Sequence, residues 1–323
     1  MTNTEMNVES AAVALQQVRD AVRTKVVGQE GVIDELLVTF LARGHALLEG
    51  VPGTAKTLLV RAMAGALGVR FKRIQFTPDL MPSDVTGIGI LRDVDRGFEF
   101  RPGPIFTDLL LGDEINRAPP KTQAALLEAM AERQVTADGV NHPLGMLFTV
   151  FATQNPIEHE GTYPLPEAQL DRFLMKISVG YPSNEAEVRV LDMYADGFDA
   201  ERESDVRLAP VVDEDGVTRL RSVADGVTVA SEIRGYVATL VRATREDTSI
   251  VLGASPRASV ALFRAARAMA VIAGREFVTP DDVKTVAPAV LRHRIRIMPE
   301  LEVEGRTADD VIGSVLSRVA VPR

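Results

Sequence analysis

The chain has 323 residues, of which 46% are hydrophobic and 25% charged, so it has globular composition and length enough for two domains. It has no cysteine, which excludes disulfides, thiolate metal sites and thiol nucleophiles, and its formal net charge of −9 argues against a protein that mainly binds nucleic acid. Residues 1–10 do not resemble a signal peptide, and no apolar run approaches the ~20 residues that span a bilayer, so we expect a cytoplasmic protein without membrane insertion.

Two amphipathic helices are expected before the first strand. Apolar residues recur at helical spacing from Val8 to Val22 and again from Val32 to Leu41, with Val26-Val27-Gly28-Gln29 between them. The short apolar run Ala46-Leu47-Leu48 then predicts a strand.

A phosphate-binding loop follows this strand and leads into a helical pattern. Small residues let backbone N–H groups turn toward a polyphosphate, while Lys56 reaches the outer phosphates and the Thr57 hydroxyl binds magnesium. Ala55 replaces the usual glycine, and its methyl group is tolerable if the residue is helical rather than left-handed. The alternative is a Gly/Pro turn that only happens to precede Lys-Thr, which the flanking strand and helix disfavour. The expected nucleotide contacts here are Gly50, Pro52, Gly53, Thr54, Ala55, Lys56, Thr57 and Leu58.

The segment after the next predicted strand, Val69 to Phe76, is irregular from Thr77 to Pro104. It contains a possible hairpin turn at Asp95-Arg96-Gly97. Long ordered loops inside a domain tend to be functional, so we interpret this segment as a functional insertion.

Two acids end the apolar run Leu109 to Gly112. This pattern is typical of a buried parallel strand whose C-terminal end meets a ligand crevice. Asp113 can hold magnesium, and Glu114 can orient and deprotonate a water that attacks the terminal phosphate. The alternative is a solvated acidic turn after a core strand.

A helix from Lys121 to Arg133 and a hairpin turning at Asp138-Gly139 precede the next buried strand, Met146 to Ala152. Asn155 follows that strand, where its amide can hold the attacking water or the terminal phosphate. Taken alone it is equally compatible with a turn asparagine before Pro156.

A last strand is predicted from Phe173 to Val179, and Tyr181-Pro182-Ser183 marks a boundary. Beyond it the pattern is helical, and the helix from Arg257 to Ala273 is expected to bury Val260, Phe263, Ala266 and Ala270. We therefore predict an α/β nucleotide-binding domain over residues 1–180 and a smaller helical domain over 181–323. Further helices are expected at Glu185–Tyr194, Ala230–Ala243, Pro280–Leu291 and Ala308–Val319.

Four blocks of sequence resemble the MoxR family of AAA+ ATPases: GVPGTAKT, LLLGDEINRAPPKTQAALLEAM, FATQNPIEHEGTYPLPEAQLDRF and GASPRASVAL. The resemblance extends from Val26 to about Ile297. It implies an AAA+ P-loop NTPase core, a parallel sheet flanked by helices, followed by a smaller all-α lid. It also implies ATP and Mg²⁺ as cofactors, with Lys56 and Thr57 in Walker A, Asp113 as magnesium ligand and Glu114 as catalytic base.

The same resemblance assigns roles outside these two motifs. Asn155 matches sensor 1, Arg172 an arginine finger that reaches the neighbouring subunit's ATP, and Arg257 sensor 2. Val27, Gly28 and Gln29 match residues that pack against adenine. Family members are similar to ring-forming, usually hexameric, chaperone-like ATPases that commonly act with proteins bearing von Willebrand factor A domains.

The leading hypothesis is therefore an ATP-hydrolysing motor that remodels or activates a protein partner. The alternatives are a nucleic-acid-acting motor, a metal-chelatase motor subunit and, least favoured, a metabolite kinase. The basic cluster Arg292-His293-Arg294 with Arg296 is interpreted as a solvated or intersubunit face rather than a nucleic-acid contact. The histidines are too dispersed to predict a metal site besides the nucleotide-bound magnesium.

Overall fold

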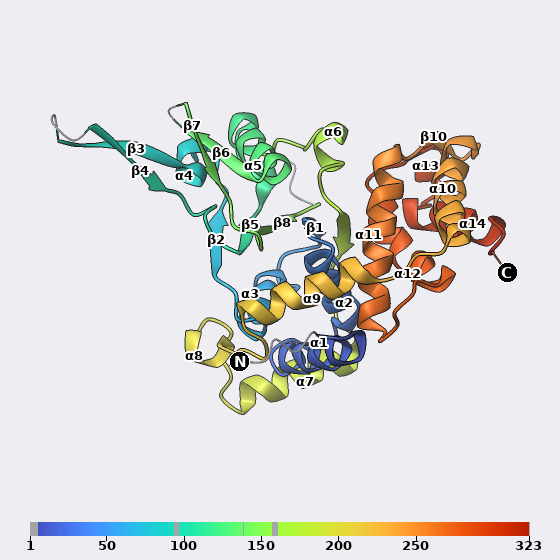
Figure 1. Cartoon of the computed structure of the whole chain (residues 1–323), viewed down its shortest axis with the longest axis horizontal. Helices are drawn as coiled ribbons and strands as arrows, with labels where there is room; N and C mark the ends of the chain where they lie inside the picture. Colours follow the sequence, from blue (N-terminus) through green and yellow to red (C-terminus); the bar gives the residue numbers. More distant parts are fainter. Residues whose placement is uncertain (1–5, 94–96, 138, 157–160, 323) are drawn as a thin grey trace.

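A parallel sheet of five strands forms the centre of the molecule, in the order β2-β5-β8-β1-β9 (Figure 1). The computed structural model describes residues 6–93, 97–137, 139–156 and 161–322. The strands of this sheet are β1 (Ala46–Glu49), β2 (Phe71–Gln75), β5 (Leu109–Asp113), β8 (Thr149–Gln154) and β9 (Met175–Ser178). All of these neighbours pair in parallel, as the alternation of apolar runs and helices predicts.

Both faces of the sheet are buried because successive strand residues point to opposite sides. In β5, Leu109 and Leu111 belong to a cluster with α1, α2 and α3, whereas Leu110 belongs to a second cluster with α5. The continuous apolar runs are therefore strands covered on two sides. These helices are α1 (Val8–Arg23), α2 (Glu30–Leu41), α3 (Lys56–Ala66) and α5 (Pro120–Glu132), with the short 3₁₀ helix η1 (Ile115–Arg117) before α5.

The segment predicted to be irregular contains regular structure. A short helix α4 (Pro82–Thr86) leads into β3 (Gly87–Asp93), which pairs antiparallel with β4 (Gly97–Pro102). Figure 1 shows this β3–β4 arm extending away from the sheet. The expectation of irregularity over 77–104 was wrong, although the antiparallel pair agrees with a hairpin there. Asp95 and Arg96 of the predicted turn lie outside the described residues.

A second hairpin pairs β6 (Gln134–Ala137) with β7 (Val140–Pro143), as predicted; Asp138 of its turn lies outside the described residues. His142 on β7 stacks on Phe100 of the β3–β4 arm with ring centroids 3.8 Å apart. The two hairpins are therefore in direct contact, and α6 (Glu167–Leu170) follows before β9.

The chain after β9 is helical, with one short antiparallel pair that the prediction omitted, β10 (Ile250–Leu252) with β11 (Arg296–Ile297). Its first helices are α7 (Asn184–Ala195), α8 (Glu203–Val206) and α9 (Glu214–Gly226). The last ones, called the lid helices below, are α10 (Ser231–Glu246), α11 (Pro256–Ile272), α12 (Pro280–Leu291), α13 (Pro299–Val303) and α14 (Ala308–Arg318).

The predicted inner stripe of α11 was partly wrong. Val260 is 53% exposed, whereas Ala266 and Ala270 are buried together with Leu262 and Ala265. Small residues dominate this helix, so an apolar stripe read from the larger side chains alone was misplaced.

The lid helices and the sheet domain share one apolar cluster, which contains Leu15 of α1, Leu36 of α2 and Leu262 of α11. Arg221 of α9 is fully buried at this junction, and its guanidinium donates hydrogen bonds to the Phe40 and Met146 carbonyls at 3.0 and 2.9 Å. The boundary at residue 180 stays a prediction. None of the described helices is long and apolar enough to cross a membrane.

Candidate nucleotide-binding site

The loop between β1 and α3 has the backbone of a phosphate cradle, with one correction to the sequence prediction. Ala55 is left-handed (φ 59°, ψ 22°), not helical, and Gly53 before it also has positive φ (83°). A β-carbon is disfavoured in this region by roughly 1–2 kcal/mol, so Ala55 is a strained position in the loop. The loop then enters α3, whose first residue is Lys56.

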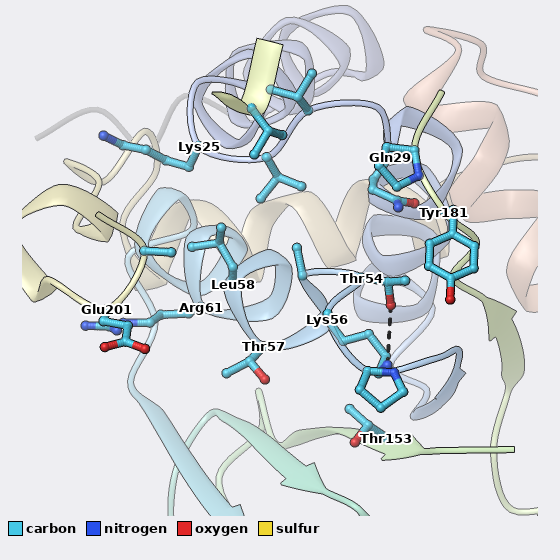
Figure 2. Close-up of a pocket in the computed structure, with 18 of the residues that line it drawn as sticks. Lys25, Gln29, Thr54, Lys56, Thr57, Leu58, Arg61, Thr153, Tyr181 and Glu201 are labelled. Atoms are coloured by element: carbon cyan, nitrogen blue, oxygen red, sulfur yellow. Dashed lines mark hydrogen bonds between the residues drawn. The ribbon is translucent and has the colours of Figure 1, made fainter. Parts of the chain in front are cut away.

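Lys56 folds back over the loop that precedes it. Its Nζ donates hydrogen bonds to the carbonyls of Gly50 at 2.8 Å and Val51 at 2.7 Å, and lies 3.4 Å from the Thr54 hydroxyl (Figure 2). Burial lowers the pKa of the Lys56 ammonium, against the opposing effect of the nearby carboxylates of Asp113 and Glu114. The ammonium therefore lies at the loop mouth, held by neutral acceptors that phosphate oxygens can replace.

The carboxylate of Asp113, at the end of β5, accepts hydrogen bonds from residues of β2, β8 and the first turn of α3. Its Oδ2 accepts hydrogen bonds from the Thr57 hydroxyl at 3.0 Å and from Arg73 Nε at 2.8 Å. Its Oδ1 accepts one from the Thr153 hydroxyl at 2.8 Å. The register of β5 between β2 and β8 brings these partners together, because the C-terminal ends of parallel strands lie at one edge of a sheet.

Glu114 lies one residue beyond the strand and is left-handed, with φ 57°. Strained non-glycine residues of this kind cluster at functional sites. Its Oε2 accepts hydrogen bonds from Gln75 Nε2 at 2.9 Å and Arg117 Nη1 at 3.0 Å, while its backbone N–H donates to the Thr153 hydroxyl. The carboxylate of Glu114 is therefore held at the site edge by polar side chains.

A cavity of about 930 Å³ opens over this loop. Most of the predicted site residues line it: Val27, Pro52, Gly53, Thr54, Ala55, Lys56, Thr57, Leu58, Asp113, Glu114 and Asn155. Gly50 lies beneath it as an acceptor for Lys56. Gly28 does not line the cavity but packs closely on α7. A β-carbon at this position would lie 2.7 Å from Ala186 Cβ, so the close packing requires glycine.

The sequence analysis missed several lining residues. Figure 2 shows Tyr181 on one side of the pocket, beside the expected adenine contact Gln29, and Lys25 and Glu201 on the other. Apolar side chains of α7 complete this part of the wall, among them Leu191. No local pattern marks these residues as ligand contacts, since they come from separate segments.

The partners of the two acids were also missed, although a signal for them existed. Arg73 and Gln75 alternate on β2 toward its C-terminal end, and Thr153 is near the end of β8. The rule that placed Asp113 at the crevice applies equally to polar residues ending the neighbouring strands.

The two predicted catalytic arginines lie elsewhere: of the residues that the structure describes, neither Arg172 nor Arg257 is among those that line this cavity. Arg172 is exposed, and its Nη1 donates to the Leu127 carbonyl at 2.6 Å. The Arg257 side chain is 76% exposed, with Nη1 3.8 Å from Asp171 Oδ2. Arg257 thus approaches Asp171, the residue before Arg172, and neither arginine lines the cavity over the phosphate loop of its own chain.

Asp171 also binds one residue of the basic cluster that was expected on a solvated or intersubunit face. The expectation was wrong for His293 and Arg294, which are buried, whereas Arg296 is exposed and pairs with Glu167. Arg294 is buried, and its Nε donates to Asp171 Oδ1 at 2.7 Å, while its other nitrogens bind the carbonyls of Phe173 (2.6 Å) and Leu174 (3.0 Å). His293 is buried and lies 3.1 Å from the Phe173 carbonyl. His293 and Arg294 therefore clamp the lid helices to the segment that carries Arg172.

Comparison with known proteins agrees with this architecture. The ATPase family associated with various cellular activities (AAA) matches residues 45–175, and an AAA lid domain matches residues 242–315. Chaperone MoxR1 of Mycobacterium tuberculosis is 44% identical over 311 residues, which cover 94% of this chain and 81% of that protein. Protein MoxR of Methylorubrum extorquens is 34% identical over 317 residues, covering 92% of each.

A solved structure has the same fold over nearly its whole length. The crystal structure of a candidate ATPase from Cytophaga hutchinsonii superimposes with a TM-score of 0.88 at 40% identity, covering 98% of this chain and 97% of that one. The sequence identity over more than nine-tenths of the chain, the two matched domains and the phosphate loop all indicate the same family. The chain belongs to the MoxR family of AAA+ ATPases.

Proposed function

We propose that this chain hydrolyses ATP in a magnesium-dependent reaction, within a ring of identical subunits, to remodel or activate a protein partner. The observation that carries the proposal is a division of the active groups. Lys56, Thr57, Asp113 and Glu114 meet at one cavity, whereas Arg172 and Arg257 lie apart from it on the same chain. A site divided in this way is complete when a second subunit supplies the arginines.

The groups at the cavity suit their proposed roles. Lys56 binds the outer phosphates in exchange for its carbonyl acceptors. Thr57 and Asp113 would hold Mg²⁺, since their oxygens lie 3.0 Å apart beside the loop and magnesium prefers a few hard oxygen ligands. The ion, when bound, would neutralise phosphate charge. Glu114 accepts the proton of the attacking water, and Asn155 positions that water or the terminal phosphate.

Both arginines are proposed to act on the neighbouring subunit's ATP. Arg172 is exposed, and among the described residues one carbonyl, that of Leu127, accepts a hydrogen bond from its guanidinium. The guanidinium can therefore turn toward a partner. Asp171 contacts Arg257 and the lid residue Arg294, which supports the idea that finger and lid move together. A guanidinium at the transferring phosphate is worth ~10³–10⁵ in rate.

The client is inferred from chemistry and from relatives. One relative is named a chaperone, which favours a protein client, and the resemblance stated above favours a partner with a von Willebrand factor A domain. A nucleic-acid track is less favoured, since His293 and Arg294 of the basic cluster are buried against β9 and its preceding loop. Little or no stimulation of ATP turnover by DNA is therefore expected.

The first test separates nucleotide binding from hydrolysis. Glu114→Gln removes the base while keeping the shape of the side chain, so we expect hydrolysis to fall ~10²–10⁴-fold with ATP affinity retained. Lys56→Ala, in contrast, should lose ATP binding. Binding is measured with a fluorescent ATP analogue and turnover by phosphate release. A Glu114→Gln chain that hydrolyses ATP at the unmodified rate contradicts the assignment of the base.

The second test asks whether sites form between subunits. Arg172→Ala keeps the base and lacks the finger, whereas Glu114→Gln keeps the finger and lacks the base. Mixing the two inactive chains should restore part of the activity, because some interfaces then combine an intact base with an intact finger. If both variants bind ATP and assemble together yet the mixture stays inactive, Arg172 is not the finger.

A further inference from the structure

A second cavity, of about 560 Å³, lies where the lid helices meet the sheet domain. It is lined by Arg43, two residues after the end of α2, and by Arg133, which follows α5 directly. Helix α11 contributes Arg264 and Arg267, and α9 contributes Asp225. Four arginines against one aspartate leave three positive charges in excess, in a chain whose formal net charge is −9. The apolar lining comes from Leu41, Ala42, Ala224, Val260 and Phe263.

Internal acceptors use only part of this donor set. Arg43 Nη2 donates to Asp225 Oδ2 at 2.7 Å, and Arg133 Nη2 donates to the Arg43 carbonyl at 2.7 Å. Within the described ranges, no carboxylate or carbonyl accepts a hydrogen bond from Arg264 or Arg267, and the Nε atoms of Arg43 and Arg267 are buried without an acceptor. The Arg267 guanidinium lies over the Phe263 ring, 5.4 Å from its centroid.

The positive charges also destabilise one another. Burial lowers the pKa of the Arg133 guanidinium, and the charges of Arg43 and Arg264 lower it further. Behind them, Arg221 is fully buried, and its pKa falls to about 9 through burial and then through the charges of Arg133 and Arg43. An anion in the cavity would relieve this repulsion and supply the missing acceptors.

We propose that this cavity binds a small phosphate-bearing anion. All four basic residues are arginine, whose planar fork matches two phosphate oxygens, and lysine is absent from the lining. The volume is within the range of small-ligand sites, ~300–1,000 Å³. The Phe263 and Val260 side chains offer an apolar wall to the uncharged part of such a ligand.

A bound ligand would join the lid to the sheet domain. The sheet domain contributes Arg43 and Arg133 to the cavity, and the lid helix α11 contributes Arg264 and Arg267. A ligand that binds only this arrangement stabilises it, by an amount that grows with the logarithm of the ligand concentration above its Kd. The site shares no lining residue with the first cavity, so its occupancy does not depend on the proposed hydrolysis.

The test uses tripolyphosphate as the probe and the full-length Lys56→Ala chain as background, so that the phosphate loop contributes little binding. Isothermal titration should show saturable binding that weakens at least ~10-fold in Arg264→Gln/Arg267→Gln, because two charge-assisted contacts are lost. The matched control is Arg234→Gln/Arg242→Gln on the exposed face of α10, which removes the same charge and should leave the affinity unchanged. Arg264→Gln alone, at an exposed position, should weaken binding several-fold if the double variant does not fold.

Three results would overturn the proposal. The first is equal tripolyphosphate affinity in the two double variants, or no saturable binding at all. The second is a hexaglutamate peptide that binds this surface more tightly than tripolyphosphate, which would indicate an acidic protein segment. The third is a change in oligomer mass in Arg264→Gln/Arg267→Gln without any phosphate present, which would indicate contact with a second copy of the chain.

Discussion

Asp113 at the nucleotide cavity and Asp171 at the lid junction each accept a hydrogen bond from an arginine Nε, at 2.8 and 2.7 Å. Their surroundings differ. The Arg73 side chain at the first aspartate is 49% exposed, whereas the Arg294 side chain at the second is 3% exposed. Arg73 also donates to Gln75, a side chain, while Arg294 donates to backbone carbonyls of the 171–174 segment.

The difference separates a movable pair from a fixed one. The exposed Arg73 can leave Asp113 for water at little cost to itself. The Asp113 side chain is only 9% exposed, but the Thr57 and Thr153 hydroxyls still donate to it when Arg73 leaves. A buried arginine that also satisfies carbonyls leaves an uncompensated carboxylate and unpaired acceptors when it is removed. We infer that Asp113 can change partners when a nucleotide binds, and that Asp171 keeps the lid fixed to the segment carrying Arg172.

The largest effect is expected from a substitution that breaks the fixed Asp171–Arg294 pair. Arg294→Ala should lower the free energy of unfolding by about 3–5 kcal/mol, because Asp171 and the carbonyls of Phe173 and Leu174 lose their donor in a buried place. Arg73→Ala should lower it by only ~1 kcal/mol, because the Thr57 and Thr153 hydroxyls still donate to Asp113. Urea unfolding followed by circular dichroism measures both.

The control is Arg242→Ala, which removes an exposed arginine paired with Glu246 and should change stability as little as Arg73→Ala does. If Arg294→Ala and Arg242→Ala unfold at the same urea concentration, the clamp contributes no more than a surface pair. The lid would then be free to move independently of Arg172.

The nucleotide site around Asp113 could be predicted from sequence, whereas the lid junction around Asp171 could not. Lys56 and Thr57 are adjacent in a motif, and Asp113 ends an apolar run, so local pattern alone places them at the crevice. Arg294 finds Asp171 123 residues away, and nothing in Arg-His-Arg distinguishes a buried clamp from a surface patch. Only the packing of α12 against β9 decides this.

Fold predictions failed for a related reason. The parallel strands and the long helices that were predicted are confirmed because hydrophobic period determines them, whereas α9 was not predicted. The β3–β4 arm was predicted as irregular although Ile88 and Ile90 alternate with glycines along β3. Both isoleucines are exposed, at 55% and 38%, so this short alternation is not the signature of a strand buried in the core. At Ala55 the tertiary loop imposes a left-handed conformation that residue type alone disfavours.

A second prediction examines the same lid junction through pH. Burial raises the pKa of Glu35 on α2 to about 7, against the charge of Arg292, the residue after α12, while Asp309 on α14 and Asp34 raise it further. Because the unfolded carboxyl ionises near 4.5, the folded state binds more protons between pH 4.5 and 7. The contribution of Glu35 to stability is therefore present below pH 4.5 and is lost as pH rises to about 7.

Glu35→Gln removes this dependence. We expect it to raise the free energy of unfolding by about 1–2 kcal/mol at pH 8, after allowance for solvent screening, and by less at pH 5. Thermal unfolding at the two pH values measures the change. If Glu35→Gln raises the free energy of unfolding at pH 5 as much as or more than at pH 8, the raised pKa of Glu35 is refuted.

The smallest expected effect concerns the phosphate loop beside the Asp113–Arg73 pair. Ala55 has φ 59°, which a β-carbon disfavours by roughly 1–2 kcal/mol, whereas glycine adopts it freely. Glycine also has a more flexible unfolded chain, which offsets about 0.4–1 kcal/mol of that gain. Ala55→Gly should therefore stabilise the protein by at most ~1 kcal/mol, measured by urea unfolding. Gly226→Ala near the end of α9, at negative φ and with open space around its β-carbon position, provides the reverse substitution as a control. A clear loss of stability in Ala55→Gly would show that the loop is not strained at this residue, and that the methyl group supports the phosphate cradle instead.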